Sequence, residues 1–426
     1  MDLLAVDRAV AAAFAAHRRA GEDTGWEAHR SVSGQRTLRE LAAFAPSEID
    51  KPFAAALARH VVRLTVLRVS QDAERRVGAT LKDARAVVRL ERAESLPYAD
   101  VWKGLLAARS PGEARAYFAA LADFGPALAE PLRELRQTRE EIQRRLGVED
   151  ASSYFVGVPH ATLVDSARAW LAASRDLARD VTRPRADEER WPLDLDLRLA
   201  RHAALGWPAR LSWRSVSELL AGLPSKPPLA LGKAPDPVGA ASFVRALSHV
   251  GAAFRRAAAP GGLPFALREP PVFVDATRTG ALFAAATLEP AFHRRALGLS
   301  PGQASDQARS LARSALLSAR LAASRVVLGE PGADHEEISA ELFGAPLPAS
   351  LAGVWPRATE RSDTEWLALV TAAARYGELR EREGDDWFRS PRAFQTLRER
   401  FGAADEKAPE PREVTALARS LEERLA

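Results

Sequence analysis

The chain has 426 residues, of which 47% are hydrophobic and 27% are charged, a composition typical of a folded globular protein and not of a disordered one. Its 60 basic and 56 acidic residues give a formal charge of +4 and are interspersed along the sequence, which argues against a nucleic-acid-binding surface. The chain contains no cysteine, so disulfides, thiolate metal sites and cysteine nucleophiles are excluded.

The N-terminal stretch indicates where the protein is located. Asp2, Asp7 and Arg8 interrupt its apolar residues, which is typical of an amphipathic helix and not of a secretory signal. No later segment approaches the roughly 18 uncharged apolar residues that a membrane span needs. We therefore expect a cytoplasmic protein with no membrane partner.

Helical periodicity dominates the rest of the chain. Three long stretches rich in Ala, Leu and Arg are predicted to be helices, namely residues 54–90, 113–146 and 303–328. A serine three residues before Glu or Gln predicts helix N-caps at Ser110, Ser300 and Ser362. A glycine after a periodic run predicts left-handed C-terminal caps at Gly147, Gly222 and Gly329.

Evidence for strands is sparse, because only residues 154–158 and 271–274 favour extended chain. The sequence therefore predicts an all-α protein with at most a small β-ribbon. Residues 223–237 are rich in proline, which prevents regular helix. We place a linker there, between an N-terminal helical lobe at 1–222 and a C-terminal helical lobe at 238–426.

Common catalytic motifs are absent from the sequence, including phosphate-binding loops and nucleophile elbows. No two of the eight histidines are three or four residues apart, so a helical two-histidine zinc site is not encoded locally. The segment beginning at His335 and Glu336 starts like a zinc motif, but Ser339 stands where the second histidine would lie. We interpret it as a helix N-terminus capped by Asp334, with an acidic first turn.

Residues 243–290 form the most informative segment, comprising a helix, a Gly/Pro-rich loop and a second helix. At 100° per residue, one stripe of the first helix is apolar and is predicted to pack inward, through Phe243, Leu247, Val250 and Phe254. The opposite face is predicted to be the stripe Arg245, Ser248, Ala252 and Arg255, with His249 beside it.

Three passages carry a resemblance to a known family: residues 246–253 (ALSHVGAA), residues 278–285 with 289–292, and residues 375–380 with 386–393. In this order they are similar to the metal-ligand helix, the helix supplying a glutamate ligand and a C-terminal helix pair of gluzincin zinc peptidases. The family is the thimet oligopeptidase and oligoendopeptidase type, with its shorter bacterial relatives. The resemblance implies a two-lobed helical body with a central cleft, lined by Arg245, Arg255 and Tyr376.

The departures from the family pattern are as informative as the resemblance. If the match holds, the two histidine ligands correspond to Ser248 and Ala252, and the general-base glutamate to His249. The glutamate ligand corresponds to Gly280 or to the nearby Thr277. The resemblance then implies a degenerate site that holds no metal and no other cofactor. It also requires Gly280 to lie close to Ser248 in the fold.

Three functions follow as alternatives. The first is a non-catalytic peptidase homologue that binds a peptide or a protein partner, such as an active paralogue. Its arginine-lined cleft would favour acidic or C-terminal carboxylate groups. The second is an active hydrolase whose ligands come from elsewhere, for instance from His293, His335, Glu336 or Glu337. The third is a purely structural helical scaffold without a ligand.

Overall fold

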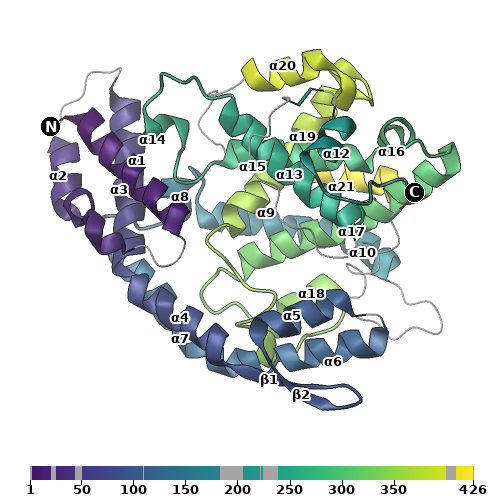
Figure 1. The fold of residues 1–426 in the computed structure, drawn as a ribbon, viewed down its shortest axis with the longest axis horizontal. Coiled ribbons are helices and arrows are strands. Elements are labelled where there is room, and N and C mark those ends of the chain that lie inside the picture. The colour runs from purple at the N-terminus through teal and green to yellow at the C-terminus, as the bar shows by residue number, and fades with distance from the viewer. Residues whose placement is uncertain are drawn as a thin grey trace.

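The computed structural model describes residues 2–20, 25–43, 50–108, 110–182, 205–220, 222–223, 238–399 and 409–425. Most of these residues lie in helices, and one two-stranded sheet lies among them (Figure 1). The all-α fold class with a small β-ribbon is therefore confirmed. Among the described residues, no helix combines the length and apolar character needed to cross a membrane.

The elements of the first half, in chain order, are α1 (Leu3–Ala20), η2 (Trp26–Val32), α2 (Gln35–Ala43), α3 (Lys51–Val69), α4 (Gln71–Asp83), β1 (Arg85–Arg89), β2 (Ala93–Pro97), α5 (Tyr98–Ala107), α6 (Pro111–Leu121), α7 (Phe124–Arg145), α8 (Ala151–Phe155), α9 (His160–Ala173), α10 (Arg175–Thr182) and α12 (Trp213–Leu219). The second half contains α13 (Ala240–Ala257), α14 (Phe265–Arg268), α15 (Val274–Ala285), η3 (Ala286–Leu288), α16 (Pro290–Ala296), α17 (Pro301–Val327), α18 (His335–Phe343), η4 (Ala349–Leu351), α19 (Ser362–Glu383), η5 (Trp387–Arg389), α20 (Pro391–Glu399) and α21 (Pro411–Leu425).

Of the three long predicted helices, only the segment 303–328 is one helix, α17. The segment 54–90 divides into α3, α4 and strand β1, with a break at Ser70. The segment 113–146 divides into α6 and α7 around residues 122–123. At Ser70 the periodicity continues through the break without a glycine or proline to mark it, whereas Gly125 and Pro126 stand just after the break at 122–123 and were a boundary signal that the periodicity obscured.

The predicted strands are wrong. Residues 151–155 form the short helix α8, and residues 271–273 are irregular before α15 begins. The strands are instead β1 and β2, paired antiparallel with Arg85 opposite Pro97. In β1, Ala86 and Val88 are buried while their neighbours are exposed. This alternation of period two covers only five residues inside a helix-like stretch, too short to stand out in the sequence.

Three of the four predicted helix N-caps are confirmed and one is wrong. The hydroxyls of Ser110 and Ser300 accept hydrogen bonds from the N–H groups of Glu113 and Gln303, which confirms both N-caps. Asp334 accepts from the N–H groups of the residues two and three positions later, as expected. Ser362 is wrong as a cap, because it is the first residue of α19 and its hydroxyl accepts from the N–H of Thr359.

Of the three glycines predicted to be left-handed C-terminal caps, one is confirmed and two are wrong. Gly147 has a φ of 81° and confirms the left-handed cap after α7. Gly222 and Gly329 do not have a positive φ, so those two predictions are wrong. Close packing accounts for both glycines, since a Cβ on Gly222 would collide with the ring of Phe394 and one on Gly329 would lie 2.9 Å from the carbonyl oxygen of Val326.

The apolar clusters of the core contain residues from both of the predicted lobes. Residues 224–237 of the predicted linker lie outside the described residues, so the division at 223–237 stays a prediction. The apolar clusters nevertheless join both sides of it. One combines Trp207 and Val216 with α13 and α15, and another combines α9 with α17, α19 and α21. A third places Leu351 against α5, α6 and α7.

The second half of the chain builds the layers that position the candidate site. Helix α13 packs on α15, α15 packs on α19, and α19 in turn contacts α17 and α21. Buried Arg320 of α17 fixes neighbouring helices by donating hydrogen bonds to the carbonyl oxygens of Leu171 in α9 and Glu341 in α18. Both acceptors lie near helix C-termini, where a positive charge is favourable. Burial lowers the pKa of Arg320 to about 10.

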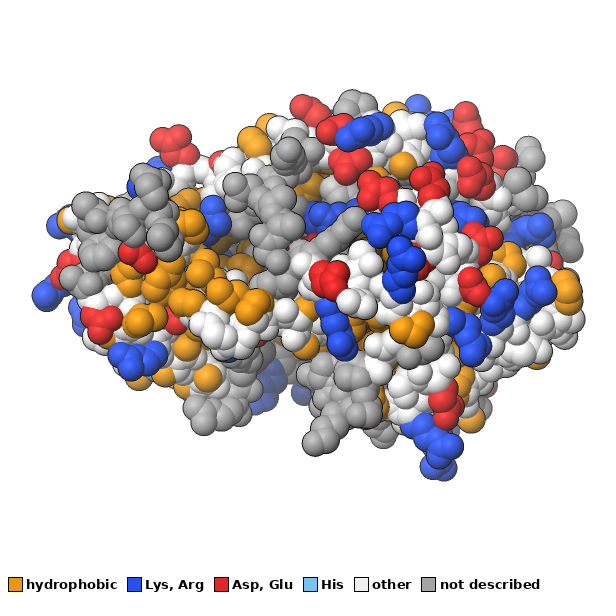
Figure 2. Space-filling view, turned by 90° about the horizontal axis from the view of Figure 1, so that it is seen from above, with side chains coloured by type: hydrophobic (Ala, Val, Ile, Leu, Met, Phe, Trp, Pro, Cys, Tyr) orange, Lys and Arg blue, Asp and Glu red, His pale blue; other side chains and the backbone are white. Residues whose placement is uncertain are grey.

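Basic and acidic side chains are mixed on the face of the molecule drawn in Figure 2. Many of the arginines form ion pairs within one helix, as Arg214 does with Glu218 at 3.0 Å. Such exposed pairs contribute little to stability but keep the surface free of a large field of one sign.

Candidate functional site

Helix α13 presents its apolar stripe to the core. Phe243, Leu247 and Val250 are fully buried, and Phe254 is 2% exposed. Their rings and branches contact Trp207, Leu282 and Phe283, among others, in one cluster. The predicted inward-packed stripe is confirmed, and it fixes the rotation of α13 about its axis.

Ser248 and Gly280 are brought into direct contact between α13 and α15. A Cβ atom on Gly280 would lie 3.1 Å from the hydroxyl of Ser248 and would collide with the Ser248 carbonyl oxygen. One turn along α13, a Cβ on Gly251 would lie 2.7 Å from the carbonyl oxygen of Thr279. The two helices therefore run antiparallel with their backbones touching, which only small residues permit. The proximity that the resemblance requires is present.

The remaining positions of the predicted stripe do not share one environment. Arg245 and His249 are exposed, and Ala252 is half-buried. Thr277, the alternative to Gly280, is half-buried and donates its hydroxyl to the carbonyl oxygen of Phe273 at 3.2 Å. The side chains differ in exposure because, at 3.6 residues per turn, residues three or four positions apart do not lie at the same angle around the helix axis.

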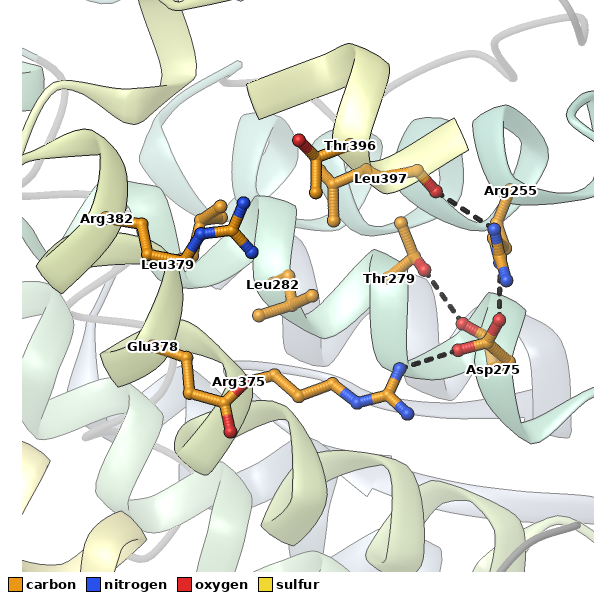
Figure 3. A pocket seen from close by; sticks show the side chains of 10 residues that line it. All are labelled: Arg255, Asp275, Thr279, Leu282, Arg375, Glu378, Leu379, Arg382, Thr396 and Leu397. Carbon is orange, nitrogen blue, oxygen red and sulfur yellow. Dashed lines mark hydrogen bonds and ion pairs between the residues drawn. The ribbon is translucent and has the colours of Figure 1, made fainter. Parts of the chain in front are cut away.

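Arg255 belongs to a buried charge network at the far end of the same helix pair. Its side chain is 3% exposed and forms an ion pair with Asp275, the second residue of α15. It also donates to the carbonyl oxygen of Leu397 at 2.9 Å. Asp275 additionally accepts from Arg278 at 3.2 Å. It also accepts from Arg375 of α19 at 2.9 Å (Figure 3). One carboxylate thus joins three helices through three arginines.

A small pocket lies beside this network. It has a volume of about 40 Å³ and lies between α13, α15, α19 and α20. The residues that line it are Arg255, Asp275, Thr279, Leu282, Arg375, Glu378, Leu379, Arg382, Thr396 and Leu397. A cavity needs about 10–15 Å³ to hold one water molecule, so this pocket has room for a small polar group.

Tyr376 lies in a second buried network. It is 3% exposed and donates its hydroxyl to Glu289 at 2.9 Å. Glu289 also pairs with Arg424 of α21, and its carboxylate lies 3.6 Å from Arg380. Burial, together with the charge of Glu289, raises the pKa of Tyr376 above its ordinary value. Tyr376 borders an open cavity of about 480 Å³ between α19 and α21.

Two of the alternative ligands of an active hydrolase, His293 and Glu336, have other roles in the fold. His293 is fully buried, and its ring nitrogens contact the Thr287 carbonyl oxygen at 2.7 Å and Gln307 at 3.0 Å. Burial lowers the pKa of His293 to about 4. Glu336 accepts from the N–H of Ala349 at 3.2 Å. Within the described ranges, no group of three or more His, Asp or Glu side chains is placed to hold a metal ion.

The sequence did not indicate that Asp275 and Glu289 are each at the centre of a buried charge network. Each is a single carboxylate in an apolar or Arg-rich stretch, and the most distant partner lies 100 positions away for Asp275 and 135 positions away for Glu289. The only local signal is the spacing of three between Asp275 and Arg278, which is common on exposed helices and does not indicate burial.

Comparison with known proteins supports the fold. No family model matches the chain, and no curated protein sequence matches it. Among solved structures, the crystal structure of oligoendopeptidase-F from Enterococcus faecium is similar, with a TM-score of 0.52 and 11% sequence identity over 99% of this chain and 90% of that one. Identity this low shows the fold alone. The chain therefore has the helical peptidase-like fold that the sequence resemblance implied.

Proposed function

We propose that this chain is a non-catalytic, cytoplasmic protein of the peptidase fold that binds a peptide or a protein partner, such as an active paralogue. The observation that carries the proposal is the direct contact of Ser248 with Gly280. These are two of the positions at which the resemblance places metal ligands.

The residues at these positions do not fit zinc. Catalytic zinc sites use three protein ligands that bind through nitrogen or oxygen at about 2.0–2.2 Å. Here the matching positions offer the hydroxyl of Ser248, the methyl group of Ala252 and Gly280, which has no side chain. A larger residue at 280 would collide with the Ser248 carbonyl oxygen, so the two backbones fill the space that a ligand side chain would occupy.

The outer face of α13 supports a binding role. Arg245 and His249 are exposed one turn apart, and neither has a hydrogen-bond or ion-pair partner among the described residues. Exposed polar side chains on a helix that is held rigidly on its other side are suited to contact a partner.

The proposal is tested with the purified full chain. We expect no stoichiometric zinc by mass spectrometry, no cleavage of an internally quenched peptide in the presence of added zinc, and saturable binding of members of a fluorescent peptide library. Stoichiometric zinc together with cleavage that a chelator abolishes would contradict the proposal and favour the active hydrolase. Absence of binding to peptides and to paralogous peptidases would favour the structural scaffold.

A further inference from the structure

The pocket beside Asp275 has a surplus of positive charge. Three arginines and two carboxylates line it, and the buried Arg278 adds a further positive charge through its contact with Asp275. The Asp275 carboxylate is shared by Arg255, Arg278 and Arg375. One carboxylate therefore faces three guanidinium groups, which leaves the surroundings of the pocket favourable to a further anion.

Two hydrogen-bond donors of the pocket have no partner among the described residues. Arg382 of α19 is exposed at the mouth of the pocket, and Thr396 of α20 is half-buried beside it. Figure 3 shows both on the side of the pocket opposite Asp275. Glu378 also lines the pocket, but no ion pair joins it to Arg382 in the described part of the chain. A ligand that accepts hydrogen bonds from Arg382 and Thr396 would lie close to Arg382 and away from the carboxylate of Asp275.

The shape of the pocket limits what the ligand is. Its volume of about 40 Å³ accommodates a group the size of a carboxylate, whereas a bound peptide as a whole would have to extend outside it. Leu282 and Leu379 form the apolar part of the lining, which suits the carbon atoms next to a carboxylate. The planar guanidinium of arginine pairs with a carboxylate through two parallel hydrogen bonds.

We propose that the pocket between α15, α19 and α20 binds the carboxylate of a peptide, with Arg382 and Thr396 as hydrogen-bond donors and Arg375 providing further positive charge. The proposal rests on the proposed function, because it takes the peptide to be a ligand that the protein binds and does not cleave. It adds the chemical class that the protein recognises, a terminal carboxylate, and the residues that recognise it.

The test is calorimetric titration of the full chain with N-acetyl-trialanine carrying a free C-terminal carboxylate, and with the matching C-terminal amide. We expect the acid to bind at least about 10-fold more tightly than the amide, because loss of a charge-assisted hydrogen bond pair has an effect of this order. Arg382→Gln should weaken binding of the acid about 10-fold and leave the amide unchanged. Arg36→Gln, which removes a distant arginine whose side chain is 93% exposed, is the matched control and should change neither.

Equal binding of acid and amide would overturn the proposal, as would unchanged binding of the acid to the Arg382→Gln protein. A third titration with inorganic phosphate separates peptide recognition from general anion binding. Phosphate binding that is as tight as that of the acid would also overturn it. These outcomes are distinct from failure of the proposed function, because an active zinc peptidase would contain stoichiometric zinc and cleave the quenched peptide whatever the acid and amide comparison shows.

Discussion

Helices α13 and α15 contact each other differently at the two ends of the pair, through backbone at one end and through charged side chains at the other. Around Ser248 and Gly280 the helices touch through their backbones, with no charge and no space between them. Around Arg255 and Asp275, about two turns away, the same helices are joined by buried charges beside a pocket. The difference follows from side-chain size. Small residues permit backbone contact at one end, whereas the long side chain of Arg255 reaches Asp275 at the other.

The contrast also shows where space lies along this helix pair. If the resemblance holds, the positions of the metal ligands are those at which Ser248 and Gly280 are in contact. The space that remains at this helix pair lies instead at the charged end, next to α19 and α20. The following predictions test whether the two ends contribute to the protein in these different ways.

The largest effect is expected from Asp275→Ala. The change leaves the side chains of Arg255 and Arg278, each 3% exposed, without their carboxylate, and breaking a buried pair from one side costs about 3 kcal/mol or more. Urea denaturation should show a fall of this size in the free energy of unfolding. Asp306→Ala is the control, because Asp306 pairs with Arg309 at the same spacing of three but with a 79% exposed side chain. Its effect should stay within about 0.5 kcal/mol. Equal effects would show that the Asp275 network is not a buried one.

The uncharged end is tested by Gly280→Ala. The added methyl group meets the carbonyl oxygen of Ser248, and since backbone cannot move aside, we expect a loss of about 1–3 kcal/mol in the free energy of unfolding. Gly377→Ala in α19 is the matched control, because a Cβ there meets nothing within 4 Å. In that variant the better helix propensity of alanine should leave stability unchanged or raise it by up to about 1 kcal/mol. A neutral Gly280→Ala variant would mean that α13 and α15 do not touch.

The smallest effect on the free energy of unfolding is expected from a charged contact outside the helix pair. Nδ1 of His160 in α9 lies 3.0 Å from Oδ2 of Asp363 in α19. The hydrogen bond to Asp363 raises the pKa of His160 above 6.5. A raised folded-state pKa means that the contribution to stability is fully present below pH 6.5 and is lost as the pH rises through the folded-state value. The stability of the unmodified protein relative to His160→Gln should therefore decrease as the pH is raised from 5.5 to 8.5. His249→Gln, at an exposed position, is the control, and a flat difference for His160→Gln would contradict the prediction.

Particular elements show how far the sequence could predict the fold. Helix α17 was predictable because its Ser300 cap, its periodicity and its apolar stripe agree with one another. Strand β1 was not, because five alternating residues cannot be distinguished from the helical sequence around them. At the candidate site, the apolar face of α13 could be predicted from spacing alone. The environments of Arg255 and Tyr376 could not, because their carboxylate partners lie on other segments, Asp275 in α15 and Glu289 between η3 and α16.

By itself, the sequence determined that the protein is helical, which faces of its helices are apolar, and that the positions resembling zinc ligands hold Ser248, Ala252 and Gly280. These properties are local, because they depend on residue type and on the 3.6-residue period of the helix. Only the tertiary structure decided that Ser248 touches Gly280, that Asp275 gathers three arginines, and that a pocket lies beside them. Those features depend on which helices meet and how closely, and packing over long sequence separations sets both.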